Sequence, residues 1–217
     1  RGPIAILCGG PSVEHDVSLA SAARIEAALK SRGDVILVTI DRTGERWAIT
    51  DAGDGTPSSA LAYLKRRGAI ALIAMHGTYG EDGTVQQLLE DAGVPYTGSN
   101  PATSALAMDK VRSADVFRAH GLRVPETLPW SVQTPDDQHA FLQAIPNRFH
   151  VPIVVKPSNL GSSVGITIAS NTRALEEAVA TAARVSTSLM AQEYLRGREV
   201  TCGVLDDGRP ESARALP

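Results

Sequence analysis

The segment from Val154 to Ile166 constrains the fold more than any other part of the chain. It runs VVKPSNLGSSVGI, so a lysine ends one β-branched run, a loop of small residues follows, and a second β-branched run begins directly after it. This order predicts a strand, a Gly/Ser loop and a second strand. Because glycine has no Cβ, the backbone N–H groups and hydroxyls of such a loop can approach an anion, and Lys156 adds a positive charge beside them. The competing interpretation is a tight hairpin with a surface lysine.

The same segment excludes one common phosphate loop. In a Walker A loop the lysine follows the glycines and the loop opens a helix. Here Lys156 precedes the glycines and the chain returns into a strand at Ile166. The loop could still bind a nucleotide triphosphate, but it would not do so as a Walker A loop.

Length and composition limit the class of protein. The 217 residues, 43% of them hydrophobic, can bury one large or two modest cores. A net charge of -3 with interspersed signs disfavours a nucleic-acid partner, and the apolar runs are too short for a membrane helix. With two cysteines and no visible secretory segment, we expect a soluble cytoplasmic protein without a disulfide scaffold.

Strands and helices alternate along the first hundred residues. Apolar runs predict strands at residues 4–8, 35–40 and 70–75, and helices at residues 18–30, 60–66 and 83–92. This order predicts an α/β domain with a Rossmann-like parallel sheet covered on both faces. In such sheets the ligand site lies at the carboxyl ends of the strands.

The sequence pattern changes at about Pro101. An amphipathic helix is expected to follow residues 104–110 and to end at Gly121, before an edge strand at residues 122–127. Further patterns predict helices at residues 136–144 and 172–183 and strands at residues 153–156 and 189–194.

The segment after the first strand, GGPSVEHDVS at residues 9–18, combines paired glycines with a helix start. A helix N-terminus by itself favours an anion. However, Glu14 and Asp16 place carboxylates there, so a bound amino group is a plausible ligand. The alternative is that both carboxylates merely cap the helix and complement its dipole.

The segment after the third strand, HGTYGEDGTVQ at residues 76–86, carries three glycines in seven residues. His76 is either a structural residue or a ligand-binding residue at the strand end. The pair Glu81 and Asp82 could serve a metal, but a helix start explains it more economically.

Two later features are candidates for nucleotide contacts. Lys110 is either a phosphate contact or a solvated helical lysine. After the last strand, a backbone edge flanked by an apolar residue can hold an adenine ring, and Glu199 can accept both hydroxyls of a ribose. Taken alone, Glu199 is only a charged residue that enters a strand.

Five segments in this order together resemble the D-alanine-D-alanine ligases of the ATP-grasp superfamily. They are GGPSVEHDVS (9–18), HGTYGEDGTVQ (76–86), ALAMDK (105–110), KPSNLGSSVG (156–165) and GRE (197–199). The resemblance implies a Rossmann-like pre-ATP-grasp domain at residues 1–103, a central ATP-grasp lid subdomain at residues 104–188, and the start of a C-terminal ATP-grasp subdomain at residues 189–217. It also implies a cytoplasmic homodimer with a role in peptidoglycan precursor synthesis.

The resemblance implies an amino-acid site. Glu14 would bind the ammonium of the first D-alanine, with Val17 also at the substrate, and His76 would lie near the carboxylate. Ser162 would hydrogen-bond with Glu14 in a catalytic network that orders the loop.

It also implies an ATP site. Lys110 and Lys156 would contact phosphates, and Ser162 and Ser163 would lie in the loop that covers them. The remaining implied contacts are Gln192, Glu193, Tyr194 and Leu195 for adenine and Glu199 for ribose. Gln192 departs from the family, which usually has a glutamate there, although its carbonyl could still accept from the adenine amine. Gln87 stands where a small residue usually follows the glutamine.

The implied reaction joins two D-alanines through an acyl phosphate and releases ADP and phosphate. The family's Mg²⁺ ligands, an Asp and a Glu with an Asn, are expected beyond Pro217, so no metal ligand is expected within the chain. We therefore expect a truncated ATP-grasp domain, which by itself would not catalyse the reaction. The alternatives are a related ligase that uses D-lactate or D-serine, and a non-catalytic ATP-binding protein.

Overall fold

A five-stranded sheet organises the first half of the chain. The computed structural model describes residues 2–31, 33–161, 163–205 and 214–215. The strand order is β4-β3-β2-β1-β5. The strands are β1 (Ile4–Gly9), β2 (Val35–Ile40), β3 (Trp47–Ile49), β4 (Gly53–Gly55) and β5 (Ile70–Ile73). β1 is parallel to both β2 and β5, which confirms the predicted parallel sheet, whereas β3 and β4 extend it as antiparallel strands.

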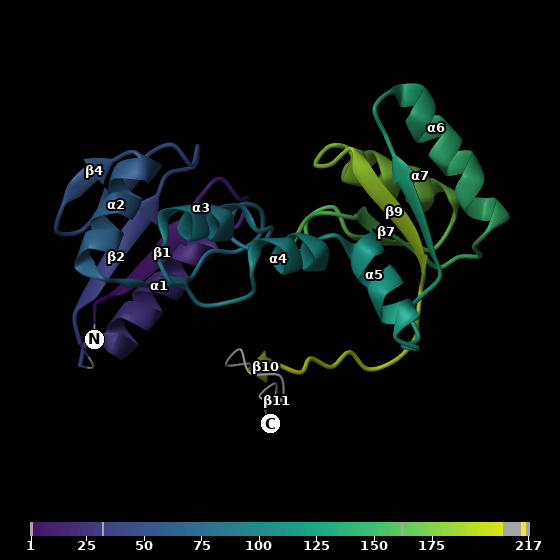
Figure 1. Ribbon diagram of the computed structural model, residues 1–217. Helices are drawn as coiled ribbons and strands as arrows, with labels where there is room; N and C mark the ends of the chain where they lie inside the picture. Colours follow the sequence, from purple (N-terminus) through teal and green to yellow (C-terminus); the bar gives the residue numbers. More distant parts are fainter. Residues whose placement is uncertain (1, 32, 162, 206–213, 216–217) are drawn as a thin grey trace.

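Helices cover both faces of this sheet (Figure 1). Helix α1 (His15–Leu29) packs on one face, and α2 (Pro57–Arg67) and α3 (Thr84–Ala92) pack on the other. β1 contributes to both cores because successive strand residues point to opposite faces. Ile6 is buried in the core on the α1 side, and Leu7 in the core with α2 and α3.

Two details of this domain differ from the prediction. The β3–β4 hairpin is absent from the predicted elements, because three-residue strands are too short for alternation to show, although Trp47 is fully buried. Helix α1 begins at His15, not at Ser18, because the residues before Ser18, a buried histidine followed by the exposed Asp16 and Val17, add no buried apolar residue at helical spacing.

Two helices connect the sheets where one was expected. α4 (Pro101–Met108) and α5 (Lys110–Ala119) are separated by Asp109, whose backbone is extended at φ -82° and ψ 103°. The Asp109 carboxylate accepts hydrogen bonds from the N–H groups of Val111 and Arg112, at 3.0 and 3.1 Å. Asp109 thus ends one helix and caps the next.

The second half of the chain contains a four-stranded antiparallel sheet with strand order β6-β9-β7-β8. The strands are β6 (Thr127–Ser131), β7 (Ile153–Pro157), β8 (Thr167–Ala169) and β9 (Ser188–Glu193). β7 pairs with β8, with Val154 opposite Ile168, so the strand–loop–strand prediction is confirmed.

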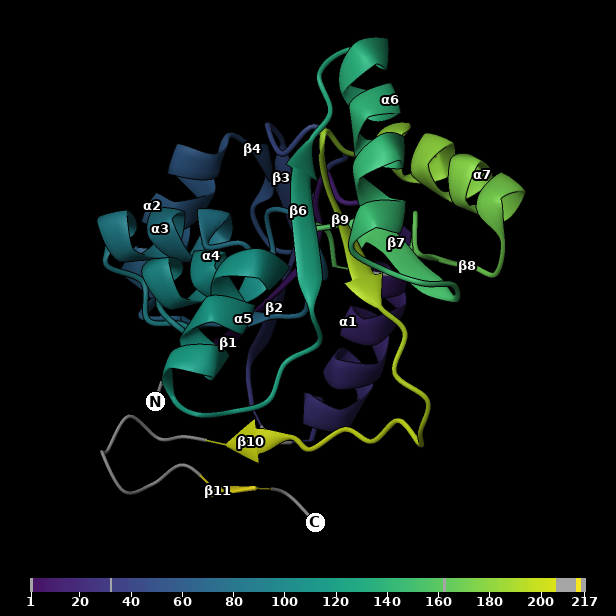
Figure 2. The same cartoon turned by 90° about the vertical axis from the view of Figure 1, so that its right-hand side faces the viewer.

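Helices α6 (Pro135–Ala144) and α7 (Thr172–Ala183), with the short 3₁₀ helix η1 (Ile145–Asn147), share a separate core with this sheet (Figure 2). The bounds of α7 match the prediction, and its expected apolar residues, Leu175, Ala178, Val179 and Ala182, are all buried. Because Val155 points into this core, its neighbour Lys156 lies on the opposite face of the sheet.

The edge strand predicted at residues 122–127 is wrong in position. Strand β6 begins only at Thr127, and residues 122–126 form no strand. β6 is nevertheless an edge strand, which tolerates Pro129 because half of its N–H groups need no partner. β10 (Val204–Leu205) and β11 (Arg214–Ala215) form a separate antiparallel pair.

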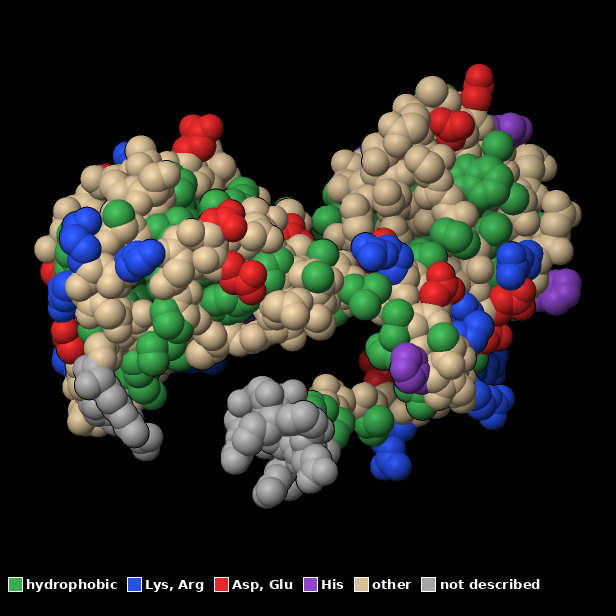
Figure 3. Space-filling model, in the orientation of Figure 1, with side chains coloured by type: hydrophobic (Ala, Val, Ile, Leu, Met, Phe, Trp, Pro, Cys, Tyr) green, Lys and Arg blue, Asp and Glu red, His purple; other side chains and the backbone are tan. Residues whose placement is uncertain are grey.

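On the face shown in Figure 3, acidic and basic side chains are interspersed and form no broad basic area. Among the described residues, none of the helices has both the length and the apolar character needed to cross a membrane.

The predicted division at residue 103 falls inside α4, and the three-part division stays a prediction.

Candidate nucleotide and amino-acid site

The loops that follow β1 and β5 lie against each other at the carboxyl ends of these strands. The fully buried Ser18 hydroxyl accepts from the Gly9 N–H at 2.9 Å and donates to the Ala74 carbonyl at 2.8 Å. Gly77 has a φ of 69°, and a Cβ there would lie 2.7 Å from Oε2 of Glu14. The close approach of Glu14 to this backbone therefore requires glycine.

The loop between β7 and β8 closes on the same place. A Cβ at Gly161 would lie 3.1 Å from Oε2 of Glu14 and 3.2 Å from Cα of Gly77. A cavity of about 160 Å³ lies at this contact, lined by Pro11, Ser12, Val13, Glu14, Gly77, Thr78, Leu160, Gly161, Val164 and Val185. Glu14 occupies the N-cap position of α1, but its carboxylate does not bond to the first-turn amides, all of which are described. Helix capping therefore does not account for Glu14.

Two lysines from different elements converge beside this loop. The Lys110 N–H donates to the Ser158 carbonyl at 2.9 Å, and its ammonium donates to the Leu160 carbonyl. The Lys156 ammonium donates to Oε1 of Gln192 at 2.9 Å.

The electrostatics of the pair favour an anion. Burial lowers the pKa of the Lys110 ammonium, which the nearby Asp109 carboxylate partly offsets. Burial also lowers the pKa of Lys156, and the positive charge of Lys110 lowers it further. Two half-buried cations that repel each other are stabilised by a bound anion. Neither lysine is a solvated surface residue.

The acidic pair after β5 shapes its own loop. Glu81 accepts from the Gly77 N–H at 2.7 Å, and Asp82 accepts from the N–H groups of Tyr79 and Thr84, at 2.9 and 3.0 Å. Thr84 is the first residue of α3, so the helix-start interpretation is confirmed for Asp82. In the part of the chain that is described, no group of three or more His, Cys, Asp or Glu side chains could hold a metal ion.

His76 is half-buried, and its Nε2 lies 3.1 Å from the Ser21 hydroxyl of α1. Sequence reasoning missed Ser21, because 55 positions separate the two residues and no local pattern connects them.

The end of β9, where adenine contacts are expected, is partly occupied by protein groups. Besides accepting from Lys156, Gln192 donates from Nε2 to the Thr127 hydroxyl at 3.1 Å. The Glu193 N–H donates to the Glu126 carbonyl at 3.0 Å, and its carboxylate accepts from the Glu126 N–H at 2.8 Å. The side-chain carbonyl of Gln192 and the N–H of Glu193 are thus engaged, whereas the backbone groups of Tyr194 and Leu195 make no hydrogen bond within the described ranges.

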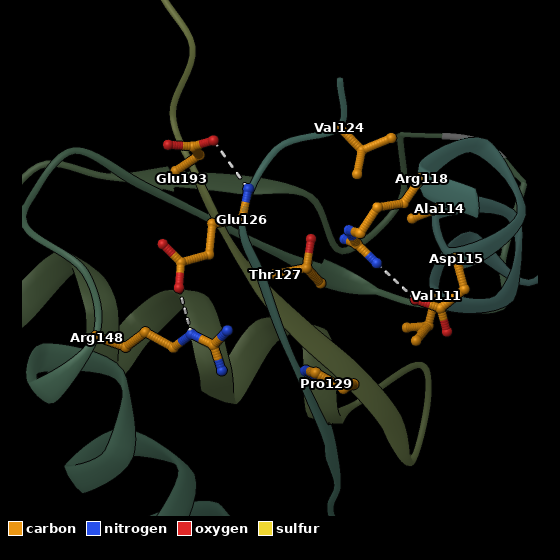
Figure 4. Close-up of a pocket in the computed structure, with 10 residues that line it drawn as sticks. All are labelled: Val111, Ala114, Asp115, Arg118, Val124, Glu126, Thr127, Pro129, Arg148 and Glu193. Carbon is orange, nitrogen blue, oxygen red and sulfur yellow. Dashed lines mark hydrogen bonds and ion pairs between the residues drawn. The ribbon is translucent and has the colours of Figure 1, made fainter. Parts of the chain in front are cut away.

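A larger cavity of about 520 Å³ lies next to this strand end, between α5 and β6 (Figure 4). In it, Arg148 pairs with Glu126 and Arg118 with Asp115, each at 2.7 Å. The lining also includes Glu193, so two arginines face three carboxylates, and this cavity has no excess positive charge for phosphates despite its size.

The remaining described residues that the sequence places in the site are exposed. Val17 is 56% exposed, Ser163 is exposed, and Tyr194 and Leu195 are 39% and 60% exposed. Glu199 is exposed in the segment between β9 and β10, which forms no strand, contrary to expectation. Ser162 lies outside the described residues.

Comparison with known proteins identifies the family. The model of the D-ala D-ala ligase N-terminus matches residues 3–69 and 56–99, and that of the D-ala D-ala ligase C-terminus matches residues 116–216. The structure of the D-alanine-D-alanine ligase from Coxiella burnetii has a TM-score of 0.79 and 30% identity, over 99% of this chain and 67% of that chain. The chain belongs to the D-alanine-D-alanine ligase family. The resemblance and the fold class stated from the sequence are confirmed.

Relatives of known name agree with this assignment. The D-alanine--D-alanine ligases of Bordetella petrii and Geobacter sulfurreducens are 39% and 38% identical, over 100% and 99% of this chain. The chain spans about 60% of the length of the relatives it matches. VanG D-Ala:D-Ser ligase from Enterococcus faecalis is also similar, with a TM-score of 0.78 and 27% identity over 96% of this chain and 67% of that chain.

Proposed function

We propose that the protein joins two D-alanines into D-alanyl-D-alanine with ATP, through an acyl phosphate. The observation that carries the proposal is that one loop meets both halves of the site. Gly161 lies against Glu14 and Gly77 at the amino-acid side, and Leu160 of the same loop accepts from Lys110 at the phosphate side. The names of the relatives support the same reaction.

The chemistry explains why such a site needs both halves. A carboxylate is a poor electrophile until it carries a good leaving group. A carboxylate oxygen of the first D-alanine attacks the γ-phosphorus and ADP leaves; the amine of the second then forms the C–N bond and phosphate leaves. Phosphoryl transfer depends chiefly on positioning and charge neutralisation. Lys110 and Lys156 provide neutralisation, and Glu14 and His76 hold the ammonium and carboxylate of the first D-alanine, with Val17 beside them.

The loop has a protective role in this proposal. By covering the phosphates, the segment that contains Ser162 and Ser163 would keep water from the acyl phosphate. Adenine would lie along Gln192–Leu195, with the ribose at Glu199. The described residues offer no side-chain cluster for Mg²⁺, so we assign no step to that ion.

The wider setting is also proposed. We place the protein in the cytoplasm, as a homodimer that supplies peptidoglycan precursors. Its domains would divide at residues 103 and 188, so that a central lid subdomain carries Lys110 and Lys156. Light scattering after size-exclusion chromatography tests the dimer, because a monomer at micromolar concentration would contradict it.

Direct binding tests the proposal most sharply. Calorimetry on the purified chain should show ATP binding, and D-alanine binding when an ATP analogue is present. Lys156→Met should abolish the first, and Glu14→Gln should weaken only the second, whereas Lys65→Met, at an exposed position of α2, should change neither. ATP binding without D-alanine binding would instead favour a non-catalytic ATP-binding protein.

A second candidate is ligation of D-alanine to D-serine, which the likeness to VanG D-Ala:D-Ser ligase supports. Mass spectrometry of the products that a version with the relatives' full length forms from equal amounts of D-alanine, D-serine and D-lactate distinguishes the possibilities. A dominant mixed product would replace D-alanyl-D-alanine as the assigned product.

A further inference from the structure

The histidine at the end of β5 is held by α1 and not by its own loop. The contact joins Nε2 of His76 to the Ser21 hydroxyl at 3.1 Å, and both residues are half-buried. The other ring nitrogen, Nδ1, makes no hydrogen bond to any residue in the described ranges. One nitrogen is thus fixed by the protein while the other remains for a ligand.

The position of Ser21 is itself rigidly set. Ser18, three residues earlier and on the same helix face, bonds to the Gly9 N–H and to the Ala74 carbonyl. Ala74 is only two residues before His76. The helix is therefore tied to the ends of both β1 and β5, and the Ser21 hydroxyl is held beside the imidazole ring.

A hydroxyl suits this place better than a carboxylate does. It donates to a neutral Nε2 and accepts from a protonated one, so it orients the ring in either state. It brings no negative charge, so a protonated His76 keeps its full attraction for an anionic ligand. We infer that Ser21 is a positioning residue that aims Nδ1 of His76 at the carboxylate of the amino-acid substrate, an inference that rests on the proposed function.

Binding measurements on three variants test this. Ser21→Ala should weaken D-alanine binding by about three- to tenfold, the usual effect of one lost hydrogen bond, and should leave ATP binding unchanged. Ser21→Thr keeps the hydroxyl and should restore D-alanine affinity. Ser58→Ala, at an exposed position of α2, is the matched control and should change neither affinity.

Nitrogen-15 NMR of the imidazole rings provides a readout that does not depend on the ligand. Ser21→Ala should shift the ring signals of His76 and leave those of the other four histidines in place. Unchanged His76 signals, or shifted signals with unchanged D-alanine affinity, would overturn the inference. If the unmodified chain binds no D-alanine, the proposed function itself fails, and the ring signals still report whether Ser21 orients His76.

Discussion

Replacing Gly161 by alanine tests whether the contact between the loop and Glu14 is part of the working site. The added methyl carbon would lie 3.1 Å from Oε2 of Glu14 and 3.2 Å from Cα of Gly77. Favourable separations between non-bonded carbon atoms are about 3.5–4.0 Å, so the loop must retreat by a few tenths of an ångström. Gly161 does not have a positive φ, so the substitution adds no backbone strain.

The expected size of the effect follows from this overlap. Overpacking of a tight contact costs about 1–3 kcal/mol. Because about 1.4 kcal/mol corresponds to a factor of ten, the closed arrangement should become about five- to 150-fold less favourable. The melting temperature should change little, since Gly161 belongs to none of the buried hydrophobic cores.

Calorimetric titration of D-alanine in the presence of a non-hydrolysable ATP analogue measures the loss. Ala62→Ser is the control, because it also adds one heavy atom but at an exposed position of α2, and it should bind as the unmodified chain does. If Gly161→Ala binds both ligands with unchanged affinity, closure of the loop on Glu14 is not required for binding and our reasoning is refuted.

Two further predictions concern the lysines. Since the folded-state pKa values of Lys110 and Lys156 lie below the ordinary 10.5, the unfolded chain binds more protons between those values and 10.5. The free energy of unfolding should therefore rise with pH across this window, more than it does in a Lys110→Met, Lys156→Met double variant. Urea titrations at several pH values measure this difference, and a parallel pH dependence in both proteins would contradict the prediction. Asp109→Ala should destabilise the protein by about 0.5–2 kcal/mol and also weaken ATP binding, because the cap positions Lys110. Asn171→Ala, which removes the cap of α7, should cost similar stability in thermal denaturation without affecting ATP affinity, and equal ATP affinities in the two variants would refute the role of the Asp109 cap.

The elements that sequence patterning located well are those with enough residues to show a period. Strand β2 and helix α7 have the predicted bounds, and each contains at least three apolar residues at strand or helix spacing. The β3–β4 hairpin has too few residues for this. Helix α4 was missed because its apolar residues, 105–108, are consecutive and form no amphipathic stripe, and only the capping bonds of Asp109 mark where α5 begins.

In the site, too, the sequence could predict some residues and not others. Glu14, His76, Lys110 and Lys156 stand in motifs, so the sequence could suggest each of them. The partners of His76 and Lys110 could not be suggested, because Ser21 lies 55 positions from His76, and Leu160 lies 50 positions from Lys110. Such contacts depend on how helices and strands are packed, which no local pattern encodes.

The bond from Lys110 to Leu160 has a consequence for how the loop responds to a nucleotide. An ammonium group carries three N–H donors, and Leu160 uses one of them. Lys110 can therefore keep its hydrogen bond to Leu160 and still donate to two phosphate oxygens. In the proposed ATP complex, this one side chain would bond to the loop and to the triphosphate, so the two would be coupled even where no loop atom touches the ligand.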